Sequence, residues 1–404
     1  MLKKNIINEI KNKKMPVIIY GAGIVGKVLL SICKEEGILV ECFCDSSEKA
    51  IKEKFCGKEV IFAPDLKTKY KEAIFLISVA AIKDAADLLY ELGFSNWYAG
   101  GLLLKELDIF QSHPDALIDY PKYAIKTCIL CHDGYLNPGK LFLRSVDIII
   151  TERCSLKCKG CSNLMQYYEK PKNCDASMLF KSIDAFCAVF DEVMDFRVIG
   201  GEPFMNIEWP IIVKKLTDNS KTKRVVIYTN GTIIPNEKYI PYLKNDKAVV
   251  VISDYGPLSR NLAGLKQMLE KNKIAHYALE ITDWLDCSAI TPHNRSIEEN
   301  REIFKKCCAK NMSTLSDGKF FRCPYAANAV RLSAVPDNKN DYIDLFQEPL
   351  DEKGILITKN KIREYLSNNK YMQICDLCNG RPLSGSSIPP NIQTEKPLSY
   401  HKYN

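Results

Sequence analysis

The sequence has no long apolar run and no concentrated patch of charge. In the 404 residues, no apolar run approaches the ~18 to 20 residues needed to span a bilayer. The lysine-rich start, residues 1–14, lacks the apolar segment of a signal peptide. The lysines behind the formal charge of +7 are scattered, which argues against a nucleic-acid surface. We therefore expect a cytoplasmic protein with neither a membrane nor a nucleic-acid partner.

The composition is that of a globular protein with an unusual number of cysteines. Hydrophobic residues make up 46% and charged residues 26% of the chain, and its length predicts two or three domains. In a reducing compartment, the 17 cysteines indicate metal or cluster ligation rather than disulfides.

Three of these cysteines lie close together after the apolar run 146–150. Cys154, Cys158 and Cys161 have the spacing C-x3-C-x2-C. Thiolates bind iron well, and a [4Fe–4S] cube usually takes four of them, so three on one loop leave one iron open. Zinc stays an alternative, although zinc prefers paired C-x2-C units and neither His nor Asp follows closely.

A glycine pair ends a later strand-like run. After the expected helix 176–190, the run 196–199 leads into Gly200, Gly201, Glu202 and Pro203. Glycines let the backbone turn its carbonyls inward at the carboxyl end of a strand, where the sites of βα barrels form. The alternation of strand and helix patterns continues through strand-like runs at 225–228, 249–252 and 276–281, which predicts a βα barrel.

Together the two motifs resemble those of the radical S-adenosylmethionine (SAM) superfamily. The resemblance implies a partial (β/α)6 TIM-type barrel in which SAM chelates the open iron. Reductive cleavage of SAM would give a 5′-deoxyadenosyl radical that removes a hydrogen atom from the substrate. It also implies that Cys154, Cys158 and Cys161 bind the cluster and that the following residues hold SAM: Gly200, Gly201, Glu202, Asn230 and Ser253. In one departure, Gly160 stands where the superfamily often has an aromatic residue against adenine.

The first hundred residues have a βαβ pattern. The strand-like run 16–20 is followed by Gly21, Gly23 and Gly26 in G-x-G-x-x-G and by a helical stretch, and the next strand ends at Asp45. Such glycines let backbone N–H groups approach a phosphate, and the acid suits ribose hydroxyls. We predict a Rossmann-like domain that binds NAD(P) or another nucleotide. A docking domain with an empty glycine loop is the alternative.

A second group of cysteines lies in the last hundred residues. Either Cys307 or Cys308 joins Cys323, Cys375 and Cys378, and four thiolates would fully ligate another [4Fe–4S] cluster or a zinc ion. The pattern, with Gly318 before Cys323, resembles the auxiliary-cluster domains called SPASM and Twitch. No cysteine follows Cys378, so we expect one auxiliary cluster and two clusters in all.

We therefore expect four segments: a Rossmann-like domain at 1–120, a linker at 121–144, the barrel at 145–300, and an iron–sulfur domain with a tail at 301–404. The expected enzyme is an oxidoreductase or isomerase that acts on a sugar or nucleotide-linked sugar. Similar N-terminal domains occur beside sugar-modifying enzymes of polysaccharide pathways. Flavodoxin or ferredoxin would supply electrons. A peptide-modifying maturase and a zinc-stabilised nucleotide-binding scaffold are the alternatives, and no residue is predicted as the catalytic acid, base or hydrogen donor.

Overall fold

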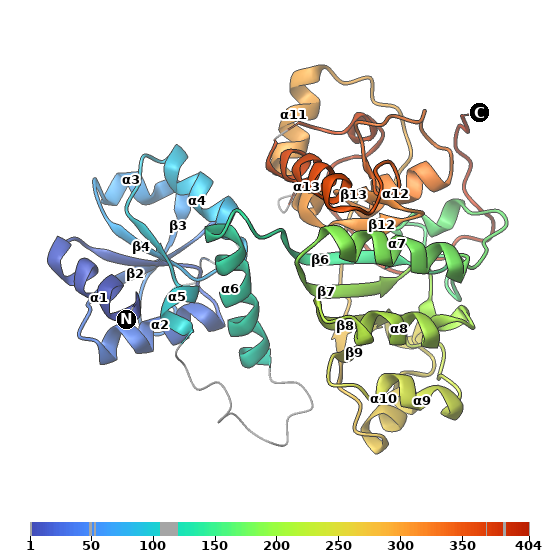
Figure 1. Ribbon diagram of the computed structural model, residues 1–404, viewed down its shortest axis with the longest axis horizontal. Coiled ribbons are helices and arrows are strands. Elements are labelled where there is room, and N and C mark those ends of the chain that lie inside the picture. The colour runs from blue at the N-terminus through green and yellow to red at the C-terminus, as the bar shows by residue number, and fades with distance from the viewer. Residues whose placement is uncertain are drawn as a thin grey trace. The chain divides into compact units, whose positions relative to one another are not determined.

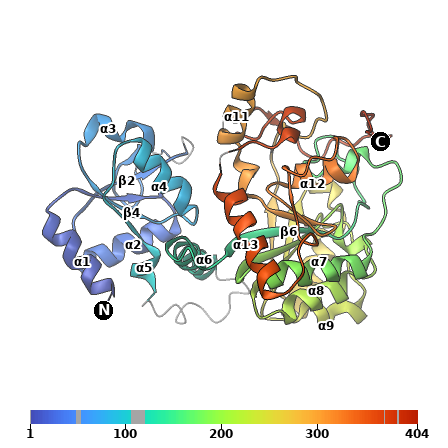
Figure 2. The same ribbon diagram turned by 45° about the horizontal axis from the view of Figure 1, so that its top comes forward.

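The computed structural model describes residues 2–47, 51, 54–105, 120–368, 370–382 and 385–403. They divide into two compact units, Met1–Phe142 and Leu143–Asn404. Each unit has its own sheet with helices around it (Figures 1 and 2). Among the described residues, no helix combines the length and the apolar character that crossing a membrane requires.

The first unit contains a five-stranded parallel sheet in the order β3-β2-β1-β4-β5. Its strands are β1 (Val17–Tyr20), β2 (Val40–Asp45), β3 (Val60–Phe62), β4 (Ile74–Ile77) and β5 (Trp97–Ala99). Its helices are α1 (Leu2–Lys13), α2 (Ile24–Glu35), α3 (Leu66–Lys69), α4 (Ile82–Glu91), α5 (Gly101–Leu104) and α6 (Tyr120–Leu136). The strand order reverses at β1, as in doubly wound nucleotide-binding folds.

Strand β1 is buried on both faces because its side chains alternate between two apolar cores. Val17 and Ile19 pack with residues of α1, α2 and α6, whereas Ile18 and Tyr20 pack with residues of α3 and α4. A fully apolar run of four residues is what a central parallel strand requires. The Rossmann-like fold predicted for this part of the chain is confirmed.

Helix α6 occupies most of the segment for which the sequence predicts a linker. Its Cys128 and Cys131 are buried, and Cys128 belongs to the core beside α2. The fully buried His132 accepts a hydrogen bond from the Gly101 amide at 3.0 Å and pairs through Nε2 with the Val79 carbonyl at 2.9 Å. Helix α6 is therefore an integral part of the first unit. The division of the whole chain into four segments stays a prediction.

The second unit contains an eight-stranded sheet in the order β10-β9-β8-β7-β6-β12-β13-β14. Its strands are β6 (Phe142–Ile149), β7 (Glu192–Ile199), β8 (Thr222–Thr229), β9 (Ala248–Asp254), β10 (His276–Glu280), β12 (Thr314–Ser316), β13 (Lys319–Phe321) and β14 (Ile343–Asp344). Its helices are α7 (Ala176–Val189), α8 (Trp209–Asp218), α9 (Ile240–Leu243), α10 (Leu262–Lys271), α11 (Ile297–Lys306), α12 (Pro324–Arg331) and α13 (Glu352–Ser367). Strands β7 to β10 pair in parallel, in chain order.

The sheet has one helix-covered face and one polar face in the region of β6 to β8. The Phe196 ring of β7 contacts Phe186 of α7 with centroids 5.3 Å apart, so Asp195 and Arg197 point to the opposite face. There Arg197 pairs with Asp147 of β6. The α/β class with a partial parallel barrel is confirmed. The sixth parallel strand, β12, lies next to β6 in the sheet rather than next to β10.

Candidate functional site

The loop after β6 carries Cys154, Cys158 and Cys161. Its start is fixed by Thr151, whose hydroxyl donates to Asn173 Oδ1 at 2.8 Å and accepts from the Arg153 amide at 3.0 Å. Further along, the Cys161 amide donates to the Cys158 carbonyl at 3.2 Å. These hydrogen bonds therefore fold the loop back on itself and tie its start to Asn173.

Cys158 is buried, Cys154 and Cys161 are half-buried, and the three thiols are close enough to repel one another when ionised. Burial raises the pKa of Cys154, and repulsion from Cys161, Glu202 and Cys158 raises it further. Burial likewise raises the pKa of Cys158 to about 11, with Cys161 adding to the shift. Iron bound to the sulfurs would remove that repulsion by stabilising the thiolates. The donor set fits a [4Fe–4S] cube that keeps one iron open.

No three His, Cys, Asp or Glu side chains of the described residues are placed to hold a single metal ion. The cysteines of a cube bind different irons, so they need not converge like the ligands of one ion.

The glycine pair packs directly against this cysteine loop. The Gly201 amide donates to the Thr151 carbonyl at 3.0 Å, and the Glu202 amide donates to the Arg153 carbonyl at 2.8 Å. A Cβ atom on Gly200 would lie 2.2 Å from the Thr151 oxygen, and one on Gly201 would lie 2.3 Å from the Arg153 oxygen. Both positions require glycine because the two backbones approach each other too closely for a side chain.

Glu202 is a fully buried carboxylate at the end of β7. It accepts hydrogen bonds from the Asn230 amide at 2.8 Å, the Thr229 hydroxyl at 2.9 Å and the Phe204 amide at 3.1 Å. Burial raises the pKa of Glu202 to about 7, although these three donors oppose the shift. A carboxylate has about four acceptor positions, and side chains and backbone of the described residues fill three of them.

The next two strand ends lie near the same loop. Asn230 donates through Nδ2 to Ser155 Oγ at 3.0 Å and contacts Cys154 Sγ at 3.7 Å. Ser253 is the second-last residue of β9 and lies two residues before Tyr255, and its carbonyl accepts from Ser259 Oγ at 3.2 Å. Burial raises the pKa of Tyr255, and repulsion from Cys161 adds to the increase. Gly200, Gly201, Glu202 and Asn230 therefore lie against the cysteine loop, and Ser253 lies two residues from Tyr255.

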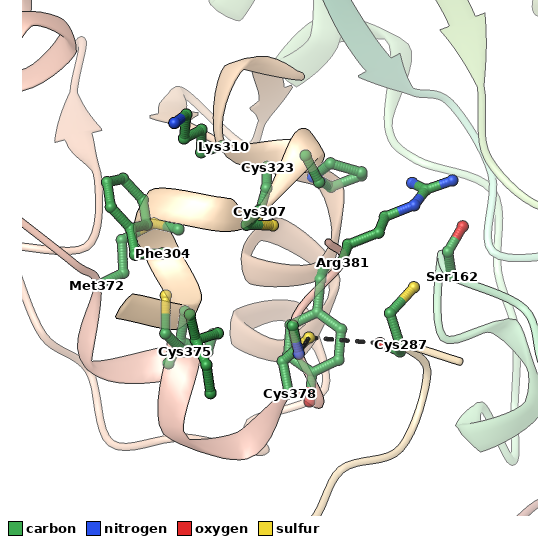
Figure 3. Close-up of a pocket in the computed structure, with 16 residues that line it drawn as sticks. Ser162, Cys287, Phe304, Cys307, Lys310, Cys323, Met372, Cys375, Cys378 and Arg381 are labelled. Carbon is green, nitrogen blue, oxygen red and sulfur yellow. Dashed lines mark hydrogen bonds between the residues drawn. The ribbon is translucent and has the colours of Figure 1, made fainter. Parts of the chain in front are cut away.

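The C-terminal cysteines line an apolar cavity in the second unit (Figure 3). Cys307 follows α11, Cys323 is the N-cap of α12, and Cys375 and Cys378 come from the 3-10 helix Gln373–Leu377 and the residue after it. All four side chains line the cavity, whereas Cys308 is not among its lining residues. Four cysteines from three segments give the donor set of a second cube.

Cys287 is a fifth cysteine of this cavity, and the sequence analysis missed it. It lies two residues after β11 (Trp284–Leu285), and its carbonyl accepts from Cys378 Sγ at 3.5 Å (Figure 3). Burial raises the pKa of the Cys287 thiol to about 11, while the nearby Arg381 guanidinium opposes the shift. No spacing pattern includes Cys287, so only the folded chain reveals it.

In the first unit, Asp45 forms a hydrogen bond with the glycine loop that follows β1. Gly21 has a φ of +110°, and a Cβ atom on Gly26 would lie 2.2 Å from the Gly21 oxygen, while one on Gly23 would meet nothing within 4 Å. At the end of β2, Asp45 accepts from the Ala22 amide at 3.2 Å and from the Ser47 amide at 3.0 Å. Asp45, which the sequence predicts to bind a ribose, thus already accepts hydrogen bonds from backbone amides of the protein.

A family model matches the central part of the chain. Residues 148–253 match the Radical SAM superfamily. A probable GTP 3′,8-cyclase of Methanococcus maripaludis is 27% identical over 139 residues, which are 32% of this chain and 45% of that protein. A GTP 3′,8-cyclase of Clostridium acetobutylicum is 32% identical over 96 residues, 23% of this chain and 30% of that one. The chain spans less than half the length of these curated relatives.

Among solved structures, BtrN in complex with AdoMet and 2-DOIA matches with a TM-score of 0.37 and 15% identity, over 59% of this chain and 93% of that one. Streptococcus suis SuiB bound to S-adenosylmethionine matches with a TM-score of 0.30 and 15% identity, over 49% of this chain and 45% of that one.

The matched region begins in β6, contains the cysteine loop and the glycine pair, and ends at Ser253. The chain therefore carries a radical SAM domain over residues 148–253, and a domain of this superfamily works with a [4Fe–4S] cluster and S-adenosylmethionine.

Proposed function

We propose that this protein reductively cleaves SAM and removes a hydrogen atom from a sugar or nucleotide-linked sugar, which it oxidises or epimerises. The observation that carries the proposal is the packing of the glycine pair and Glu202 against the cysteine loop. This contact puts a buried carboxylate beside the Cys154 thiol. When bound, the cluster and SAM together supply the radical that attacks an unreactive C–H bond.

In this proposal Cys154, Cys158 and Cys161 hold the catalytic cluster. Backbone hydrogen bonds fix the short loop that carries them. Three protein ligands would leave one iron of a [4Fe–4S] cluster free to bind SAM.

The strand ends that carry Glu202, Asn230 and Ser253 would hold SAM. The fourth acceptor position of Glu202 suits the SAM ammonium group, since a buried carboxylate binds a cation strongly. The carbonyls of Gly200 and Gly201 are further acceptors for that group. Asn230 and Ser253 would contact the ribose.

An auxiliary [4Fe–4S] cluster would occupy the cavity of Figure 3, with Cys307, Cys323, Cys375 and Cys378 as ligands. Cys307 is preferred over Cys308 because only Cys307 lines the cavity. Arg381 also lines it, and a guanidinium beside four thiolates offsets part of their negative charge.

The polar face of the sheet supports a polyhydroxylated substrate. Asp147 pairs with Arg197, and the neighbouring Asp195 pairs with Arg224 at 2.8 Å, on the face that α7 leaves uncovered. The Arg197 Nη2 atom is buried and has no hydrogen-bond partner among the described residues. Paired acids and guanidinium groups bind sugar hydroxyls and phosphates. The curated relatives are named for a reaction of GTP, which is compatible with a nucleotide-linked substrate.

For the first unit, a nucleotide at Gly21, Gly23 and Gly26 stays a prediction. A ribose hydroxyl would have to compete with the Ala22 amide for Asp45. A flavodoxin or ferredoxin in the cytoplasm is the reductant that we propose.

Deuterium transfer tests the substrate class. Anaerobically reconstituted protein would be reduced with dithionite in the presence of SAM and either sugar nucleotides deuterated on the ring carbons or deuterated peptides. We expect deuterium in 5′-deoxyadenosine from a sugar nucleotide, because the radical takes its hydrogen from the substrate. Transfer from peptides alone would contradict the sugar assignment, and Glu202→Gln is the control in which transfer should fall.

A further inference from the structure

The C-terminal segment 385–403 returns to the cysteine loop and lies along it. The Lys159 amide donates to the Ile392 carbonyl at 2.7 Å, and the Thr394 amide donates to the Lys157 carbonyl at 2.7 Å. These two bonds flank an antiparallel bridge between Cys158 and Gln393. We call residues 385–403 the strap.

Gln393 is the residue of the strap that contacts a cysteine sulfur. Its Nε2 atom donates to Cys158 Sγ at 3.2 Å and to the Asn391 carbonyl at 2.6 Å, and its Oε1 atom accepts from the Lys157 amide at 2.6 Å. The Lys157 amide can only donate, so the oxygen of the Gln393 side chain must face it. The nitrogen is therefore directed at the sulfur.

A second contact explains the glycine before the third cysteine. A Cβ atom on Gly160 would lie 2.6 Å from Ile388 of the strap and 3.3 Å from the Trp284 ring. Ile388 belongs to β15 (Ser387–Ile388), which pairs with β11, the strand of Trp284. The strap thus occupies the space that an aromatic side chain at position 160 would need.

We propose that Gln393 is a positioning residue of the catalytic cluster, which it tunes through an N–H···S hydrogen bond to the ligand Cys158. The inference rests on the proposed role of Cys158. A donor to a cluster sulfur withdraws electron density and stabilises the reduced cluster, so it raises the reduction potential. Reductive cleavage of SAM requires the reduced form, which gives the strap a direct influence on the reaction.

Two substitutions separate the hydrogen bond from the packing of the strap. Gln393→Glu keeps the acceptor for the Lys157 amide but replaces the N–H donor with a negative oxygen. Gln393→Met has a similar length and neither polar group. Thr394→Val is the matched control, because it removes the Thr394 hydroxyl bond to the Lys157 carbonyl at 3.2 Å and leaves both the strap backbone and Gln393 in place.

The measurement is a redox titration of anaerobically reconstituted full-length protein, followed by electron paramagnetic resonance. The signal that changes on addition of SAM identifies the catalytic cluster. We expect a more negative midpoint potential in Gln393→Met, a still more negative one in Gln393→Glu, and the wild-type value in Thr394→Val.

Wild-type potentials in both Gln393 variants would overturn the inference and leave the proposed function intact. An equal shift in Thr394→Val would also overturn it, because the effect would then come from anchoring of the strap. Wild-type protein without a SAM-responsive cluster would overturn the inference and the proposed function together.

Discussion

SAM binding should depend on the ionisation of Glu202. Burial raises the pKa of this carboxyl to about 7, and only the carboxylate attracts the SAM ammonium group. The ionised fraction, and with it the affinity, therefore rises as pH increases towards 7. At pH 6, one unit below that pKa, about one tenth of the molecules carry the charge. The dissociation constant of SAM should therefore be about tenfold larger than its value for fully ionised Glu202.

The assay is equilibrium binding of SAM to the reconstituted, unreduced protein between pH 5.5 and 7. Higher pH is avoided because α-amino groups begin to lose their own proton at about 7.7 to 8.0. Glu202→Gln should bind SAM about 10 to 100-fold more weakly near pH 7, which corresponds to about 1.5–3 kcal/mol for a charged hydrogen bond. Its affinity should not change over this range.

The exposed carboxyl of Asp184 on α7 provides the control. Asp184→Asn should retain the wild-type affinity and pH dependence. A wild-type dissociation constant that is independent of pH, or the same pH dependence in Glu202→Gln, would refute the role of the Glu202 charge.

Three further predictions concern other parts of the chain. Burial lowers the pKa of His132 from 6.5 to about 4, so the unfolded chain binds a proton at a higher pH than the folded first unit does. The free energy of unfolding should therefore fall by about 3 kcal/mol as pH falls from 6.5 to 4. Urea unfolding should show this loss in wild type and much less of it in His132→Gln. Iron analysis should find about four irons fewer in Cys307→Ser and no loss in Cys308→Ser, and the opposite result would exchange the two ligands. Gly201→Ala forces the glycine pair away from the cysteine loop and should cost about 1–3 kcal/mol and abolish SAM cleavage, whereas Gly23→Ala, which meets no neighbouring atom within 4 Å, should leave SAM cleavage unchanged.

Local patterns in the sequence predict the strands and the loops that follow them. Apolar runs indicate β1, β7, β8 and β9, and the cysteine loop and the glycine pair come directly after strands, where parallel sheets place their sites. Since both motifs are local, the sequence is enough to expect that they meet. It also indicates Asp45 at the end of β2, although not its bond to the Ala22 amide.

Contacts between distant segments could not be predicted. Cys158 and Gln393 are 235 residues apart in the sequence but in contact in the fold. No periodicity in the proline-containing tail indicates that it returns to the cysteine loop. Cys287 has no partner at a metal-ligand spacing, and the choice between Cys307 and Cys308 depends on how the chain turns at the end of α11. The pairing of β12 with β6 is likewise a matter of tertiary structure.

The most direct test of the central claim is the iron and sulfide content of anaerobically reconstituted protein, together with 5′-deoxyadenosine release after chemical reduction in the presence of SAM. We predict about eight irons per chain and release of 5′-deoxyadenosine. Cys154→Ala should lower the iron content by about four and abolish release. Zinc in place of iron, or release that persists in Cys154→Ala, would contradict the assignment of Cys154, Cys158 and Cys161 to a catalytic cluster.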